Sequence, residues 1–170
     1  SDGQRVLILG GGLAGLSFAT ALATEAPTLD ITLLEAHSFR SGTPNPMDTR
    51  GSALNLHSVE ILKRWDLWSA LASHTGPIGD IHVSHRGHFG SALMTAEELD
   101  MPALGYVVEN HELGRALLAR AEQLGVNVRA PVRCVSLEAG AEKPALLTKE
   151  GERLTADLVL LAAGVAKKWV

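Results

Sequence analysis

The sequence predicts an α/β fold in which buried parallel strands alternate with helices and a block of antiparallel strands interrupts the alternation. Three observations support this prediction. The apolar run Arg5–Leu9 leads directly into a glycine cluster, a second apolar run covers 30–35, and the segment 13–26 between them is rich in alanine and leucine and is followed by proline. Short continuous apolar runs are typical of strands buried on both faces. The chain therefore opens with a strand, a helix and a second, parallel strand.

The next part of the sequence predicts a long loop and then a helix. Residues 37–52 are rich in Ser, Gly, Pro, Asn and Asp, and long loops inside compact domains are often functional. The segment 58–73 carries an apolar stripe with helical spacing. Its members Trp65 and Trp68 are interpreted as core residues, because stripes of this kind usually pack inward.

The remaining elements form an antiparallel block, a helix, a meander and a closing strand. Short strands are expected at 80–84, 90–95 and 104–109, with a turn at Arg86-Gly87. Asn110 can cap a helix that runs to Leu124 before Gly125. Further short strands are expected at 126–129, 132–137, 145–149 and 153–155, and the apolar run 157–164 predicts a last, fully buried strand that ends in glycine.

Composition excludes several classes of function. The 170 residues carry a formal net charge of −4, so no basic excess is present to bind nucleic-acid phosphates. The single cysteine, Cys134, excludes an internal disulfide and a cysteine-based zinc cluster, and is interpreted as a buried structural residue. No metal site is expected at His82, His85 and His88, because offsets of three residues do not place all three on one strand face.

The glycine cluster carries the main functional signal. The run Gly10–Gly15 matches the pattern G-x-G-x-x-G, which binds dinucleotides when it follows a strand and opens a helix. In that setting Gly10 permits a tight turn, Gly12 leaves room for a pyrophosphate, and Gly15 lets the helix pack closely on the sheet. The N–H groups at the start of the helix, around Leu13 and Ala14, then face the phosphates.

Glu35 is the acidic residue that this pattern requires. It follows Gly15 by 20 residues and ends the second strand, where a carboxylate can accept hydrogen bonds from ribose hydroxyls. Its charge would repel a ribose 2′-phosphate, so NADP is not expected as the tightly held ligand. The alternative is a glycine-rich turn with a surface glutamate. The pattern does not separate NAD from FAD, but the strand block after residue 78 replaces the α/β alternation of a dehydrogenase and favours a Rossmann-like FAD-binding domain.

Four stretches carry a resemblance to a known family. They are the glycine pattern with Glu35, the segment Asp48–Leu54 with its D-x-R-x-x-A-L motif, the segment 81–90 and the segment 105–114. Together they resemble the flavoprotein aromatic hydroxylases, and most closely the 2-polyprenyl-6-methoxyphenol hydroxylase branch of ubiquinone biosynthesis. The glycine pattern is generic, whereas the last two stretches are specific to that branch. The similarity covers nearly the whole chain.

The resemblance implies an FAD-dependent monooxygenase that hydroxylates a phenolic, polyprenylated ring, with NAD(P)H as transient reductant and O2 as co-substrate. It also implies that Arg50 contacts the FAD phosphates and that Arg115, where the family commonly has glutamine, lies near the cofactor. No catalytic acid or base is assigned, because the flavin carries the chemistry. The candidate cofactor-binding residues are Gly10, Gly12, Leu13, Ala14, Gly15, Glu35, Ala36, Arg50, Arg115 and Gly164.

One departure from the family leaves two alternatives open. The family usually ends this half with a strand followed by Asp-Gly, whereas this chain has Ala163-Gly164. The Leu-Ala-Ala-Gly ending fits other FAD oxidoreductases, such as amine or hydroxy-acid oxidases. The missing aspartate also fits a non-catalytic dinucleotide-binding module. The stretches Asp48–Leu54 and Arg86-Gly87 favour the hydroxylase over the oxidases.

The resemblance also predicts the organisation of the chain and its surroundings. An incomplete FAD-binding domain is expected at 1–77 and 109–170, and part of a substrate-binding sheet at 78–108, where Tyr106 contacts substrate or belongs to the core. The 170 residues are fewer than half of what the family needs, so an N-terminal part unable to complete turnover alone is expected. The lack of a charged leader predicts a cytoplasmic protein, and a polyprenyl substrate implies peripheral contact with the inner membrane or with other enzymes of the ubiquinone pathway.

Overall fold

The structure, a computed structural model, describes residues 3–39, 50–87, 89–140 and 142–164. The chain divides into two compact units, the first made of Ser1–Thr43 with Gly114–Val170 and the second of Pro44–Leu113. Each unit is described by itself. The predicted assignment of 78–108 to substrate binding concerns function and stays a prediction.

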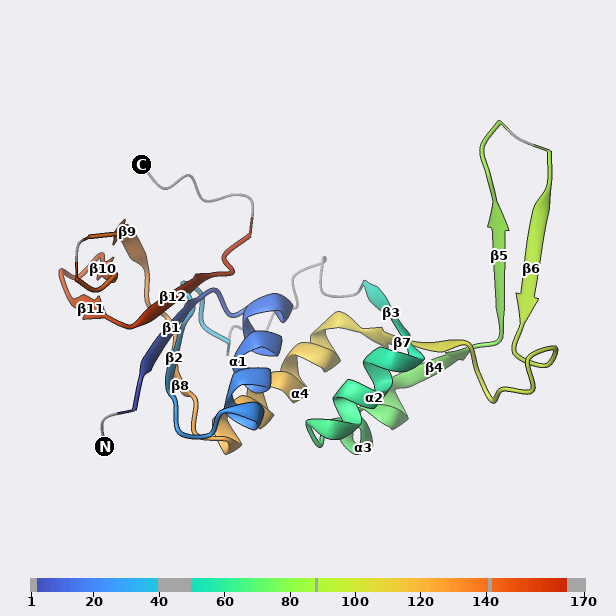
Figure 1. Ribbon diagram of the computed structural model, residues 1–170, viewed down its shortest axis with the longest axis horizontal. Helices are drawn as coiled ribbons and strands as arrows, with labels where there is room; N and C mark the ends of the chain where they lie inside the picture. Colours follow the sequence, from blue (N-terminus) through green and yellow to red (C-terminus); the bar gives the residue numbers. More distant parts are fainter. Residues whose placement is uncertain (1–2, 40–49, 88, 141, 165–170) are drawn as a thin grey trace. The chain divides into compact units, whose positions relative to one another are not determined.

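The first unit is built on a four-stranded parallel sheet (Figure 1). In the order β12-β1-β2-β8, its strands are Leu158–Leu161, Arg5–Leu9, Asp30–Leu34 and Asn127–Arg129. Helix α1 (Leu13–Glu25) connects β1 to β2, and these two strands pair in parallel along their full length. The predicted strand, helix and strand at the start of the chain are therefore confirmed, as is the α/β class.

Different elements cover the two faces of this sheet. Leu7, Leu9 and Leu34 belong to a core cluster with residues of the antiparallel meander β9 (Cys134–Glu138), β10 (Ala145–Thr148) and β11 (Arg153–Thr155). Successive side chains of a strand point to opposite faces. Ile8 and Leu33, both 0% exposed, therefore lie on the other face, where α1 packs. Cys134 is buried in the meander-side cluster, as predicted.

The closing strand differs from the prediction. A fully buried strand is expected over 157–164, but Leu158 and Leu161 are 50% and 45% exposed. The reason is the position of β12 at the edge of the sheet, where among the described residues it pairs with β1 alone. An edge position leaves the strand with fewer neighbours to cover its side chains.

The second unit contains two small antiparallel sheets. One has the order β3-β7-β4, with strands Gly51–Asn55, Gly105–Glu109 and Thr75–Ile78, and the other is the hairpin of β5 (Asp80–Ser84) and β6 (Ser91–Thr95). The strands predicted at 80–84, 90–95 and 104–109 are confirmed, as is the helix at 110–124, observed as α4 (Asn110–Gln123). Strands β3 and β4 were not predicted. Residues 40–49 of the predicted loop, with Asp48, lie outside the described residues.

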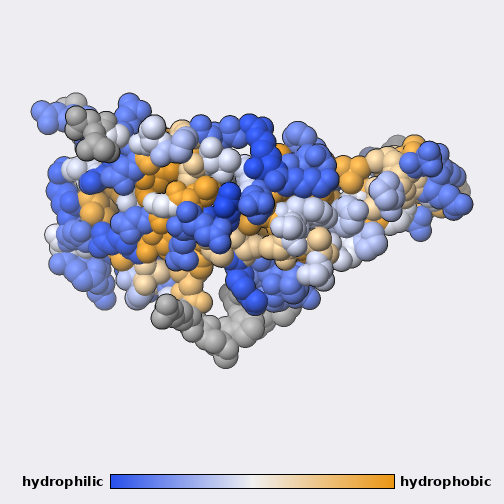
Figure 2. Space-filling model, turned by 90° about the horizontal axis from the view of Figure 1, so that it is seen from below, coloured by the Kyte–Doolittle hydropathy of each residue, from blue (hydrophilic) through white to orange (hydrophobic). Residues whose placement is uncertain are grey.

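The hairpin exposes apolar side chains (Figure 2). The register pairs Ile81 with Met94 and Val83 with Ala92. Since directly paired residues share a face, these four residues form one apolar row. Ile81, Val83 and Met94 are 39%, 57% and 47% exposed.

The single helix predicted over 58–73 is wrong, because the chain forms two helices there. Helix α2 (Leu56–Arg64) is separated from α3 (Trp68–Leu71), which continues into the short 3-10 helix η2 (Ala72–His74). At the break Asp66 has a φ of 61°. The Leu67 N–H donates to the Leu62 carbonyl at 2.8 Å, and the Asp66 N–H to the Lys63 carbonyl at 2.9 Å. These two bonds end the helix in a Schellman motif, with aspartate in the place that glycine usually takes.

The two tryptophans of the predicted stripe are half-buried rather than fully enclosed. Leu62, Leu67 and Leu71 form the buried part of this region. Trp68 packs on Tyr106 with ring centroids 5.1 Å apart and an interplanar angle of 68°, which is a favourable edge-to-face arrangement. Tyr106 therefore packs against α3 within the second unit.

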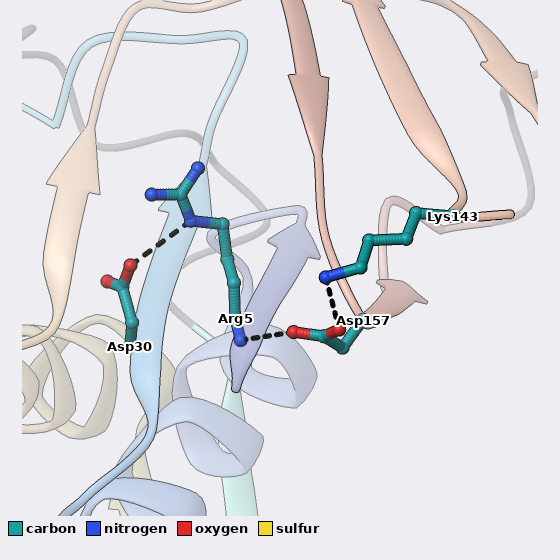
Figure 3. Close-up of polar contacts among 4 residues, drawn as sticks. All are labelled: Arg5, Asp30, Lys143 and Asp157. Carbon is teal, nitrogen blue, oxygen red and sulfur yellow. Dashed lines mark hydrogen bonds and ion pairs between the residues drawn. The ribbon is translucent and has the colours of Figure 1, made fainter. Parts of the chain in front are cut away.

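Charged side chains join the strand ends of the first unit (Figure 3). Asp157 Oδ2 accepts the main-chain N–H of Arg5 at 2.8 Å, and its Oδ1 lies 2.7 Å from Lys143 Nζ. Arg5 Nε lies 3.1 Å from Asp30 Oδ2 on β2. The hydrogen bond from Lys143, together with the Arg5 N–H, lowers the pKa of the Asp157 carboxyl.

This lowered pKa predicts a dependence of stability on pH. Because the carboxyl is more acidic in the folded chain, its contribution is present at neutral pH and is lost as pH falls below about 4. Asp157→Asn is expected to lower the urea midpoint at pH 7, and its difference from the unaltered chain should shrink toward about pH 3. Asp80→Asn, at an exposed position in the second unit, is the matched control. An Asp157→Asn difference that stays constant across this range would contradict the role of the ionised carboxylate.

Candidate dinucleotide site

The turn after β1 requires glycine at its first position. Gly10 has a φ of +114°, a conformation that L side chains rarely adopt. A Cβ there would lie 2.5 Å from the carbonyl oxygen of Ala162. The Gly10 N–H donates to Leu34 at 2.8 Å, and the Ala162 N–H donates to Leu9 at 2.7 Å. The turn is therefore enclosed between the ends of β2 and β12.

The start of α1 lies directly against this turn. A Cβ at Gly15 would collide with the carbonyl oxygen of Gly10, and the Ala162 side chain would be 3.5 Å away. Only glycine at position 15 allows the helix to approach this closely. The close approach brings the N-terminus of α1 to the carboxyl end of the parallel sheet, the place where α/β proteins bind ligands.

Gly12 differs from its neighbours because space surrounds it. A Cβ at this position would meet no atom within 4 Å. Gly12 is the N-cap of α1 and provides no side-chain hydrogen bond to the first turn, which holds no acidic residue. The first N–H groups of a helix have no partner within the helix, and they form the positive end of its dipole. The open space at Gly12 thus adjoins a group of donors suited to an anion.

Glu35 lies beside the same turn, and the fold fixes its main chain. The Glu35 N–H donates to the Arg129 carbonyl at 3.0 Å, and the Glu35 carbonyl accepts the Val132 N–H at 2.7 Å. Its side chain, 18% exposed, accepts the Gly11 N–H at 2.6 Å through Oε2 and the His37 N–H at 2.9 Å through Oε1. A main chain held from both sides thus presents the carboxylate to the glycine turn.

These hydrogen bonds decide the charge of Glu35. Burial by itself would raise the pKa of this carboxyl, but the hydrogen bonds from Gly11 and His37 outweigh burial and lower it. Glu35 is therefore ionised at neutral pH. An ionised carboxylate only accepts hydrogen bonds, so it suits ligand hydroxyl groups.

The structure brings part of the predicted set together. Six of the predicted residues lie in or directly beside the turn after β1, namely Gly10, Gly12, Leu13, Ala14, Gly15 and Glu35. Ala36 is next to Glu35 in the chain. Gly164 follows β12 with a φ of +75°, and Arg115 is exposed on α4. Arg50 belongs to the second unit, where its carbonyl accepts the Asn110 N–H at 2.9 Å. Contacts of Arg50 and Arg115 with a cofactor stay predictions, and Val165–Val170 lie outside the described residues.

Two residues of the site were missed from the sequence. Gly11 occupies an unspecified position of the glycine pattern, yet its N–H is a partner of Glu35. His37 also contacts Glu35, through both main chain and ring. The sequence held no established signal for His37, because a side-chain contact with the main chain two residues further on is typical of Asn and Asp rather than of Glu.

No metal centre is found among the residues that the structure describes, since no three His, Cys, Asp or Glu side chains there are grouped to hold an ion. His82 and His85 are exposed on and beside β5, and His88 lies outside the described ranges. Over the same parts of the chain, no helix combines the length and apolar character needed to cross a membrane.

Fold and site together define a dinucleotide-binding α/β domain. The glycine turn, the open N-terminus of α1 and the ionised Glu35 fit a ligand that carries phosphates and a ribose. The chain belongs to the FAD binding domain family, which matches residues 4–166. The cofactor of this domain is therefore FAD. The space at Gly12, which a side chain would fill, fits its pyrophosphate.

Curated relatives include enzymes of ubiquinone biosynthesis. The chain is 31% identical over 165 residues to ubiquinone hydroxylase UbiL from Rhodospirillum rubrum, a match that covers 94% of this chain and 37% of the relative. It is 31% identical to 3-demethoxyubiquinol 3-hydroxylase from Escherichia coli, over 94% of this chain and 41% of the relative. The chain therefore spans roughly two-fifths of the length of these relatives.

Solved structures share the fold over nearly the whole chain. The Diels-Alderase PyrE3 matches with a TM-score of 0.76 and 25% identity, over 96% of this chain and 33% of that protein. The tetrameric 2-methyl-3-hydroxypyridine-5-carboxylic acid oxygenase matches with a TM-score of 0.73 and 23% identity, over 96% of this chain and 40% of that protein. The predicted arrangement of an α/β cofactor domain interrupted by antiparallel strands is confirmed.

Proposed function

We propose that this chain is the FAD-binding part of a monooxygenase that hydroxylates a phenolic, polyprenylated ring in ubiquinone biosynthesis, with NAD(P)H as reductant and O2 as co-substrate. The observation that carries the proposal is the open N-terminus of α1 at Gly12 beside the ionised Glu35. Membership of the FAD binding domain family supports the cofactor. The hydroxylase names of the curated relatives support the reaction and favour it over an amine or hydroxy-acid oxidase.

The candidate residues other than Ala36 each have a proposed task in holding FAD. The N–H groups of Leu13, Ala14 and Gly15 donate to the pyrophosphate, with Gly10 and Gly12 leaving the space for it. Glu35, followed by Ala36, accepts hydrogen bonds from the adenosine ribose. Arg50 and Arg115 supply positive charge for the phosphates, and Gly164 lets the chain pass close to the cofactor. The bound FAD supplies the redox chemistry, and these residues bind and orient it.

The second unit supplies the proposed substrate side. The apolar row of Ile81, Val83, Ala92 and Met94 on the hairpin suits an isoprenoid chain, because burial of apolar surface is favourable. A substrate of this kind resides in lipid, so we propose peripheral association with the inner membrane or with other enzymes of the pathway. The rest of the catalytic machinery would come from sequence present in the longer relatives.

One observation favours a second candidate, a dinucleotide-binding module without catalysis. Ala163 stands where the family usually has an aspartate, and this segment lies beside the glycine turn. Such a module would bind FAD without passing electrons from NAD(P)H to O2. Because the rest of the catalytic machinery would lie in sequence beyond this chain, the two candidates are separated by anaerobic addition of NADPH or NADH to the FAD-loaded longer protein that contains it. Bleaching of the flavin is expected of the monooxygenase and not of the module.

The proposed cofactor is tested by titration of the purified chain with FAD. Binding is expected to give flavin absorption that stays with the protein on gel filtration and to change the flavin fluorescence. A chain that is folded by circular dichroism, is colourless when purified and leaves the fluorescence of added FAD unchanged would overturn the assignment.

A further inference from the structure

Glu35 is held by a side chain as well as by the main chain. His37 Nδ1 lies 3.1 Å from Glu35 Oε1, the oxygen that also accepts the His37 N–H at 2.9 Å. The other oxygen, Oε2, accepts the Gly11 N–H at 2.6 Å. The two carboxylate oxygens are thus fixed by different parts of the chain, one by the glycine turn and one by His37.

The direction of the ring contact follows from the charge of Glu35. An ionised carboxylate has no hydrogen to donate, so the imidazole must donate through Nδ1–H. The ring is in its Nδ1–H tautomer or is protonated, and both forms make the same contact. Hydrogen bonds from the His37 side chain are also among the causes that lower the pKa of the Glu35 carboxyl.

The number of acceptor positions limits where a ligand can bind. A carboxylate offers about four acceptor positions, two on each oxygen. The two donors of His37 fill those of Oε1, and Gly11 fills one of those on Oε2. One position on Oε2 is left. The Glu35 side chain lies close to Gly11, since a Cβ built there would be 3.0 Å from Glu35 Cβ and 2.6 Å from the Phe39 ring.

We propose that His37 is a positioning residue for the adenosine ribose of FAD: its ring fixes Oε1 of Glu35 and so directs the remaining acceptor position of Oε2 toward a ribose hydroxyl. This inference rests on the proposed function, in which Glu35 binds that ribose. It assigns His37 a role that no part of the glycine pattern predicts. The His37 side chain is 80% exposed, so its task is at the ligand surface rather than in the core.

Two substitutions at this position separate the donor from the rest of the ring. His37→Ala removes the Nδ1 donor, whereas His37→Asn places an amide nitrogen at nearly the same position, two bonds from Cβ. Contacts between exposed polar groups are worth little, so His37→Ala is expected to weaken FAD binding by about two- to fivefold. His37→Asn is expected to retain most of the affinity. His57→Ala, at an exposed histidine of α2, is the matched control and should leave the affinity unchanged.

A second measurement reads the contact without FAD. The titration of the Glu35 carboxyl carbon by NMR should move to higher pH in His37→Ala, because a donor to the ionised form is lost. In His37→Asn it should remain lowered. Loss of affinity in His37→Ala with recovery in His37→Asn, accompanied by these titrations, would establish the role.

Three results would overturn the inference. They are unchanged FAD affinity in His37→Ala, equal losses of affinity in the Ala and Asn variants, and a Glu35 titration that does not move to higher pH in His37→Ala. If Gly12→Val abolishes binding while His37→Ala has no effect, only the role of His37 fails. If the unaltered chain binds no FAD, the proposed function fails and this inference fails with it.

Discussion

Gly12→Val is expected to abolish the binding of FAD and to leave the fold intact. The valine side chain would project into the space where the pyrophosphate approaches the N-terminus of α1, and beyond Gly12 and its two chain neighbours no protein atom lies within 4 Å of its Cβ to be disturbed. The fold should tolerate the change because Gly12 has an extended conformation, with φ −74° and ψ −177°. A loss of N-cap preference costs about 1 kcal/mol. Fluorescence titration with FAD measures the affinity, and urea denaturation measures the stability.

An exposed glycine outside the helices and strands serves as the control for this variant. Gly140→Val adds the same side chain where no atom lies within 4 Å and the φ is not positive. The control should bind FAD with the affinity of the unaltered chain. If Gly12→Val also keeps this affinity, the phosphate site does not lie at the start of α1.

Gly15→Ala is expected to destabilise the folded chain by about 2 kcal/mol or more, because overpacking a close contact typically costs 1–3 kcal/mol. The added methyl group would collide with the main-chain oxygen of Gly10, which cannot rotate away as a side chain can. The helix would have to move from the end of the sheet. The free energy of unfolding from urea denaturation is the measurement.

The matched control for Gly15→Ala is a second helical glycine. Gly114 lies inside α4, and a Cβ there would make only an ordinary contact, 3.6 Å from Leu13 Cδ2. Alanine is a better helix former than glycine by roughly 0.5–1 kcal/mol, so Gly114→Ala should be neutral or stabilising. Equal changes in the two variants would show that helix propensity, and not the contact with Gly10, governs position 15.

The best-predicted part of the fold is the opening of the chain. β1 and β2 are buried from their second residues onward, so an uninterrupted apolar run was a sufficient signal. The glycine pattern then located the turn and the start of α1, because Gly10 and Gly15 each meet a steric requirement of the main chain. Glu35 followed from spacing alone.

Other elements depend on contacts that a sequence pattern does not carry. At the break between α2 and α3, Asp66 takes a left-handed conformation. Glycine usually occupies such a position, so an aspartate there does not predict the end of a helix. Strand β12 has a sequence as apolar as β1, yet its edge position leaves it partly exposed. His37 became a candidate only through distances from its ring and its main-chain N–H to Glu35.

The edge position of β12 also leads to an expectation about the behaviour of the chain in solution. An unpaired strand edge presents main-chain donors and acceptors that can pair with another molecule, and exposed apolar side chains strengthen such pairing. Among the described residues no strand covers the outer edge of β12, where Leu158 and Leu161 are exposed. We therefore expect concentrated samples of this chain to self-associate through this strand, so cofactor titrations are best made on dilute protein.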